Sequence, residues 1–185
     1  MQHAPRDFRG ITLIEILIVV IVISILSGLA LPAFSNIGQS MASRSSSSAI
    51  SVALSQARIA AVMRGDHVVA CPSTDISSCS NSLIWHHGWI VFADRDHNRQ
   101  RNDDEPLIAV AQAQARGVAI VSSIGRRTVR FERDGTAGGS NITFTMCDRR
   151  GATHASTLVL NNAGRLRKGT PNPSQAAAAC AAIDT

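Results

Sequence analysis

The sequence lacks the motifs that mark the common enzyme classes. No serine lies in a G-x-S-x-G turn, no glycine-rich phosphate loop occurs, and none of the six histidines forms a pair with the spacing of a helical metal site. These absences exclude the usual serine-hydrolase, nucleotide-phosphate and helix-borne metal sites. We therefore expect a protein that is not an enzyme and that holds no cofactor.

Charge is nearly absent from residues 11–34, an apolar run in which Glu15 is the only charged residue. A helix of this length rises about 36 Å, which exceeds the ~30 Å hydrocarbon core of a bilayer. We expect a transmembrane and assembly helix. A carboxylate in such a helix costs roughly 2.5–3.5 kcal/mol on insertion scales, so Glu15 requires a cationic partner.

Proline is absent between residues 35 and 64, where apolar residues recur at helical intervals. The pattern predicts that the first helix continues through residues 35–65 as an amphipathic segment and stops at Gly65. The apolar face expected from this spacing holds Ile37, Met41, Val52, Ile59 and Met63.

A short leader, residues 1–10, precedes the apolar run and carries Arg6 and Arg9. It ends in Gly10 directly before the apolar residues, whereas a secretory signal peptide places its small-residue cleavage site after them. The positive leader stays in the cytoplasm, so we expect residues 35–185 on the far side of a bacterial inner membrane, in the periplasm.

The leader and the residues after it, RG followed by ITLIEIL, resemble the processing site of type IV prepilins and type II secretion pseudopilins. The resemblance implies that prepilin peptidase cuts between Gly10 and Ile11 and methylates the new amino group. It also implies that Glu15 pairs with the amino terminus of a neighbouring subunit during assembly. Ile11 replaces the family's usual phenylalanine, a change expected to preserve processing, and Pro32 matches the family's helix-weakening proline.

The four cysteines fall in the part of the chain expected to face an oxidising compartment. They predict two disulfides, for which three connectivities are possible, and we favour Cys71 with Cys79 and Cys147 with Cys180. A zinc site is the alternative at the first pair, but its spacing matches no common zinc finger and the compartment argues against it. That site would use Cys71, Cys79, His86 and His87.

Beyond Gly65 the chain becomes a series of short alternating segments separated by turn residues, which predicts strands with one buried face. We expect an α+β fold in which the long N-terminal helix packs on an antiparallel β-sheet. The expected divisions are a leader (1–10), the apolar helix (11–34), its amphipathic continuation (35–65) and a β-rich globular domain with a C-terminal tail (66–185).

The order of several segments resembles the GspH/FimT-like branch of minor pilins and pseudopilins. These are ARIAA in the helix, the cysteine-rich turn from Cys71 to Cys79, WHHGWIVFAD, and LVLNNAGRLR near the C-terminus. The resemblance implies a type IV pilin-like fold and assembly with other pilins in a cell-surface pilus.

Trp85 and Trp89 lie four residues apart, hence on the same face of a regular strand that would also place His86 and His87 on opposite faces. We expect both indoles in the core. Stacking on nucleic-acid bases is the alternative, and it requires at least one exposed ring.

The segment after Ala93 has the ligand spacing of a twelve-residue calcium loop. The sixth position holds Arg99 in place of glycine, and Arg95 and Arg101 add positive charge, so we favour a polar hairpin loop without metal. Calcium binding stays open as the alternative; its ligand positions are Asp94, Asp96, Asn98, Gln100, Asn102 and Glu105.

Positive charge collects in residues 116–185, which hold ten basic residues and four acids, a formal charge of +6. A field of this sign favours anionic partners such as DNA. Within this region Arg165 and Arg167 are spaced to lie about 7 Å apart on one strand face, a geometry that suits phosphate oxygens. Lys168 follows them. A solvated strand end without a ligand is the alternative.

Gly164, Arg165 and Arg167 match the GRxR motif that FimT-like minor pilins use for DNA capture. The resemblance therefore implies a minor pilin of a type IV pilus that binds DNA non-specifically for uptake in natural transformation, or competence. The alternative is a structural tip or initiation subunit of a type IV pilus or type II secretion pseudopilus. The expected partners are DNA, other pilins, prepilin peptidase and, before assembly, the inner membrane.

Overall fold

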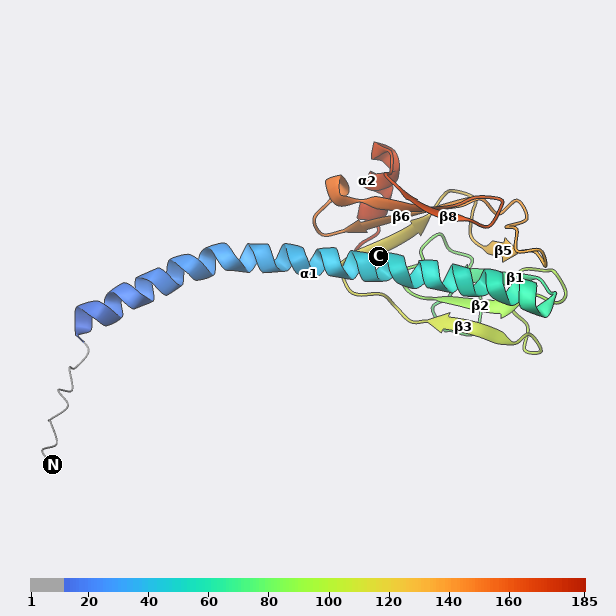
Figure 1. The fold of residues 1–185 in the computed structure, drawn as a ribbon, viewed down its shortest axis with the longest axis horizontal. Helices are drawn as coiled ribbons and strands as arrows, with labels where there is room; N and C mark the ends of the chain where they lie inside the picture. The colour runs from blue at the N-terminus through green and yellow to red at the C-terminus, as the bar shows by residue number, and fades with distance from the viewer. Residues whose placement is uncertain (1–11) are drawn as a thin grey trace, which may run out of the picture. The chain divides into compact units, whose positions relative to one another are not determined.

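The computed structural model describes residues 12–185, apart from the side chains of residues 28–33 (Figure 1). The chain divides into two compact units, one ending at Gly38 and the other formed by Gln39–Thr185. Helix α1 (Leu13–Arg64) contributes to both units, which are described separately below.

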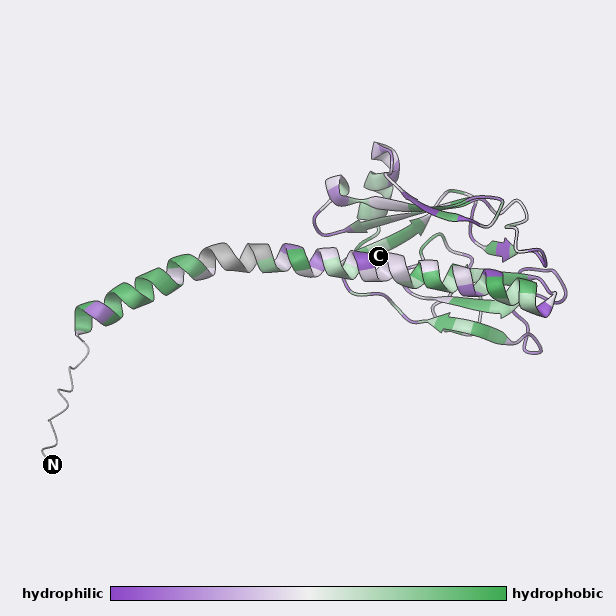
Figure 2. Cartoon of the chain, in the orientation of Figure 1, coloured by the Kyte–Doolittle hydropathy of each residue, from purple (hydrophilic) through white to green (hydrophobic). Residues whose placement is uncertain are grey.

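In the first unit, α1 starts after Thr12, whose hydroxyl oxygen accepts a hydrogen bond from the backbone N–H of Glu15 at 3.3 Å. Glu15 lies in the first turn, where a negative side chain is favoured by the helix dipole. Residues 16–27 are almost all hydrophobic (Figure 2) and their side chains are exposed. Among the described residues, no helix combines the length and the apolarity needed to cross a membrane. The span expected at residues 11–34 includes Ile11 and the side chains of 28–33, which lie outside the described part.

The second unit contains two four-stranded antiparallel sheets, with strand orders β3-β2-β1-β5 and β4-β6-β7-β8. The expected α+β class is confirmed, with two sheets rather than one. The strands are β1 (Val68–Pro72), β2 (Trp89–Ala93), β3 (Leu107–Ala111), β4 (Val118–Ser122), β5 (Val129–Phe131), β6 (Ile142–Asp148), β7 (Ser156–Leu160) and β8 (Leu166–Gly169). The 3-10 helix η1 (Ala152–His154) precedes β7, and helix α2 (Pro173–Ala181) follows β8.

The C-terminal part of α1 packs against both sheets through a face that the sequence pattern did not predict. Its buried face carries Ile50 and Leu54 together with small alanines such as Ala57 and Ala61. At 100° per residue this face lies opposite the predicted one. The residues predicted to form the apolar face, Ile37, Met41, Val52, Ile59 and Met63, are all more than half exposed.

That prediction was wrong because the residues of α1 that pack against the sheets are largely alanines. A pattern based on large apolar side chains overlooks alanine, although alanine can pack closely in a helix interface. The larger residues therefore remain on the solvent side of this unit.

The two tryptophans lie in the core between α1 and the sheets. Trp85 is fully buried and Trp89 is 1 % exposed, and the Trp85 ring meets Phe144 edge-on with centroids 5.0 Å apart. Core packing is confirmed, and base stacking is excluded because neither ring reaches solvent. The two residues do not share one strand as expected: β2 begins at Trp89, and a turn containing His86 separates it from Trp85.

Both favoured cysteine pairs form disulfides in the structure. Cys71 bonds Cys79, which precludes the zinc alternative, and Cys147 bonds Cys180. The second bond joins β6 to α2, a helix that was not predicted from the sequence. In α2, Asn172 and Gln175 form a reciprocal capping box.

Candidate nucleic-acid interface

The predicted DNA-binding residues lie at the hairpin between β7 and β8, at the edge of the second sheet. Asn161 organises this hairpin. Its carbonyl oxygen accepts from the Gly164 N–H at 2.9 Å, and its side-chain oxygen accepts from the Arg165 N–H at 2.9 Å. The Asn161 N–H in turn donates to the Arg165 carbonyl oxygen at 3.1 Å. Both the N–H and the carbonyl oxygen of Arg165 are therefore fixed by hydrogen bonds to Asn161.

Gly164 allows the hairpin backbone to lie against the Gly135 carbonyl oxygen, which a residue with a Cβ could not do. Its φ of +73° lies in the left-handed region, and a Cβ at this position would overlap the carbonyl oxygen of Gly135. The same carbonyl accepts a hydrogen bond from Arg58 Nε of α1 at 2.8 Å. Arg58 thus connects α1 to the turn between β5 and β6, against which Gly164 of the hairpin packs.

Three cations project from this edge into solvent. Arg165, Arg167 and Lys168 are exposed, whereas Leu166 between the two arginines is half-buried and packs against the core. This agrees with the expected alternation. Among the described residues, none of the three pairs with an acid or makes a side-chain hydrogen bond. We refer to Arg165, Arg167 and Lys168 as the β8 basic cluster.

Lys168 also lines a groove of about 280 Å³ together with Arg44 of α1 and Arg150. Arg150 is already neutralised, because its Nε and Nη2 donate to the two carboxylate oxygens of Asp148 at 2.9 and 2.8 Å. Burial alone would raise the pKa of Asp148, but the hydrogen bonds and charge of Arg150 outweigh it and lower that pKa. Arg44 is the cation that sequence reasoning missed, because only folding brings this helix residue to β8.

The remaining predicted site residues fall elsewhere. Gly10 and Ile11 lie outside the described residues, and Glu15 is exposed in the first turn of α1.

Two family models match the sequence. The prokaryotic N-terminal methylation motif matches residues 5–31, and the type II transport protein GspH matches residues 47–164, more than half of the chain. The chain belongs to the GspH family. This GspH-family chain is a minor pilin of a type IV pilus or a pseudopilin of a type II secretion system. Its methylation motif implies processing by prepilin peptidase, membrane anchoring and then assembly with other pilins.

Two crystal structures of the type IV minor pilin FimU of Pseudomonas aeruginosa strain PAO1 share its fold. One matches with a TM-score of 0.55 at 15% identity, covering 79% of this chain and 97% of FimU. The other gives a TM-score of 0.54 at 16% identity, covering 74% and 98%. The fold is therefore that of a type IV pilin. A comparison with curated proteins returns no match.

The GspH match ends at Gly164, so the β8 basic cluster lies just beyond it. Membership of the family accordingly says nothing about these three side chains, and their function has to be argued from their own chemistry.

Proposed function

We propose that this minor pilin binds DNA without sequence preference through the β8 basic cluster and serves DNA uptake in natural transformation. The observation that supports the proposal is the exposure of three cations in and directly before the edge strand β8, none paired with an acid among the described residues. Unpaired cations on a surface are available to a polyanion without first breaking an internal ion pair.

The chemistry favours the DNA backbone over the bases. A guanidinium presents paired N–H donors that match phosphate oxygens, and Lys168 adds a point charge. The hairpin fixes the backbone of Arg165 through Asn161. Neither tryptophan is exposed for base stacking. Contacts of this kind position a protein on DNA and carry little sequence information.

The surrounding charge supports the same partner. Residues 116–185 carry a formal charge of +6, and Arg44 lies along the groove that Lys168 lines. One copy with about three phosphate contacts would bind weakly, since each contact contributes roughly −0.9 to the log–log salt slope on duplex DNA. Several copies in one filament, or several sites on one long DNA, would raise the overall affinity by avidity.

The direct test is fluorescence anisotropy with duplex DNA and the full chain in detergent, over a range of salt concentrations. We expect a log–log slope of roughly −2.7 for the native chain. The Arg165→Gln, Arg167→Gln double variant should weaken binding to all sequences alike and reduce the slope to roughly −0.9. Arg116→Gln with Arg133→Gln is the matched control, because both arginines are exposed and the charge loss is equal.

Equal loss of affinity in the two double variants would refute a defined site and leave only general charge attraction. Unchanged affinity in the β8 variant, with an unaltered circular dichroism spectrum, would instead favour a structural tip or initiation subunit. A transformation assay with the same variants tests whether DNA binding serves DNA uptake.

A further inference from the structure

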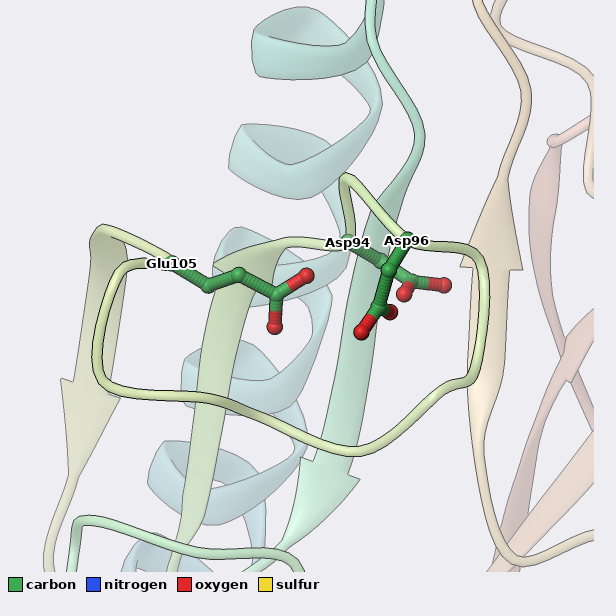
Figure 3. Close-up of side chains that lie close together, drawn as sticks. All are labelled: Asp94, Asp96 and Glu105. Carbon is green, nitrogen blue, oxygen red and sulfur yellow. The ribbon is translucent and has the colours of Figure 1, made fainter.

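Three carboxylates converge in the loop between β2 and β3, far along the chain from the β8 basic cluster. The ligand oxygens of Asp94, Asp96 and Glu105 all lie within 4.8 Å of one another. Asp94 follows directly on the last residue of β2, and Glu105 closes the loop two residues before β3. Figure 3 shows the Glu105 side chain extending across the loop toward the two aspartates.

Two of the three carboxylates are withdrawn from water. Asp94 is fully buried and Glu105 is 3 % exposed. Glu105 accepts hydrogen bonds from the N–H groups of Arg95 at 2.7 Å and Asn102 at 3.0 Å, so its position is fixed. A buried negative charge is costly unless it is paired, and here a second buried acid adds repulsion.

Asp94 itself has one oxygen without any partner. Its Oδ1 accepts from the Arg99 N–H at 3.3 Å, whereas its Oδ2 is buried and has no hydrogen-bond donor in the described part of the chain. A cation bound here would neutralise an orphaned carboxylate oxygen that shares a small space with two other carboxylates.

The loop's arginines do not supply that cation. The Arg95 guanidinium contacts the Asp104 carbonyl oxygen at 3.3 Å and the Asp66 carboxylate at 4.0 Å. Arg101 donates to the carbonyl oxygens of Ser77 at 3.0 Å and Glu105 at 3.3 Å. Within residues 12–185, no ion pair joins an arginine to any of the three clustered carboxylates.

We propose that this loop binds a calcium ion between Asp94, Asp96 and Glu105. All three donors are hard oxygens, which suit calcium better than zinc, and a twelve-residue loop has the length of known calcium loops. The three acids stand at the first, third and twelfth positions of a twelve-residue loop, the spacing of calcium ligands in such loops.

The residue that argues against calcium in the sequence is accommodated in the structure. The sixth position normally requires glycine for a sharp turn, and here Arg99 takes a φ of 62°, in the left-handed region. The loop backbone therefore makes the turn without glycine. Asn98 and Asn102, at the fifth and ninth positions, donate their side-chain amides to Asp96 Oδ2 at 2.7 and 2.6 Å, so these amides hold the Asp96 carboxylate in place.

Calcium at this position would connect two parts of the first sheet. The Arg101 bond to Ser77 and a 3.9 Å contact between Cys79 Sγ and the Arg99 carbonyl oxygen join the loop to the turn closed by the Cys71–Cys79 disulfide. A bound ion would hold both segments in place. The site is independent of DNA binding, because the β8 basic cluster belongs to the other sheet.

The test is calorimetric titration of calcium into the chelator-treated full chain in detergent, with thermal melting in parallel. Extracellular calcium modules have Kd values of about 10⁻⁴–10⁻³ M, and we expect a value in this range. Calcium at about 100 times Kd should raise the Tm by roughly 5–10 °C. Glu105→Gln and Asp96→Asn should each weaken binding at least tenfold. Asp103→Asn with Asp104→Asn is the matched control, since both acids are exposed in the same loop.

Absence of both heat and Tm shift in the native chain at 10-fold excess over the weakest expected Kd would overturn the proposal. Equal losses in the control and in the ligand variants would also overturn it, because they would indicate diffuse attraction to acidic residues. Magnesium that binds as tightly as calcium would overturn the assignment of the ion. Asp96 is exposed, so the Asp96→Asn variant is expected to fold. It keeps the proposal testable if the Glu105→Gln variant does not fold.

Discussion

At the residue scale, the second unit contains one histidine whose protonation is opposed by its surroundings. His86 is 7 % exposed, and its Nδ1 accepts a hydrogen bond from the Ile120 N–H at 3.3 Å. Burial, followed by the neighbouring His87, lowers the pKa of His86 below its ordinary value of 6.5. The neutral ring is therefore the form that fits the fold.

We expect the protein to lose stability as the pH falls below about 6.5, where the unfolded chain takes up a proton at this position before the folded chain does. The contribution is fully present above pH 6.5. His86→Asn keeps an acceptor for Ile120 and removes the titration, so its free energy of unfolding should change less between pH 7.5 and 5.5. Urea unfolding of both forms at the two pH values measures the difference. The exposed His154 provides the control in His154→Asn, and a native-like pH dependence in His86→Asn would contradict the assignment.

At the element scale, the sequence predicted most strands but misjudged two helical features. Alternating apolar and polar residues in β6 and β7 allowed their buried faces to be predicted. Successive side chains of a strand always point to opposite faces, so the period of two does not depend on the tertiary structure. The pattern in α1 misled because its buried face is built largely from alanine. β1 was missed because all five of its residues are buried, so it shows no alternation, and because it lacks the large apolar side chains that mark the equally buried β2.

Helix α2 was also missed, although its start carries a signal. Asn172, Pro173 and Gln175 form a capping box with proline at the first helical position, which is a typical helix start. The small residues after it were interpreted as a tail. At the candidate DNA site, exposure of the arginines was predictable from local spacing, whereas the approach of Arg44 and Arg58 was not, since it depends on how α1 packs.

The Cys147–Cys180 disulfide should contribute more stability than the Cys71–Cys79 disulfide. The two bonds close loops with sequence separations of 33 and 8, and the entropy of loop closure gives about 3.7 and 2.5 kcal/mol respectively. Urea unfolding of Cys147→Ser with Cys180→Ser, compared with Cys71→Ser with Cys79→Ser, measures the order. Only the first pair should also release α2, where Ala176 and Ala179 pack around Cys147. Increased hydrogen exchange confined to α2 would report that release, and an equal or reversed order of stability would contradict the loop argument.

At the scale of the whole molecule, the chain combines an N-terminal methylation motif with a separately compact unit that contains both sheets. The motif covers Gly10, Ile11 and Glu15. Substitutions in the N-terminal motif are therefore expected to impair processing and assembly without unfolding the globular unit.

Gly10→Val should prevent processing, whereas Glu15→Ala should allow processing but reduce entry into filaments, because the Glu15 carboxylate is needed only when subunits pack. Mass spectrometry of the amino terminus and the amount of protein in sheared filaments measure the two steps. Glu15→Asp, which keeps the charge, is the control and should restore part of the assembly. Filaments that contain the uncut Gly10 variant, or normal amounts of the Glu15→Ala variant, would contradict these roles.

The position of β8 at the rim of its sheet has a consequence for solubility. At the opposite rim, β4 is covered by residues 83–85, which form hydrogen bonds with Ile120 and Ser122, so its outer side is not open along its whole length. β8 is the last strand in the sheet order, and no other described residue pairs with its outer side. An open rim invites another chain to add a strand, and charged side chains are the usual protection against this. Arg167 and Lys168 therefore make two copies of β8 repel each other, which matters in a protein that must be crowded side by side in a filament without its sheets fusing.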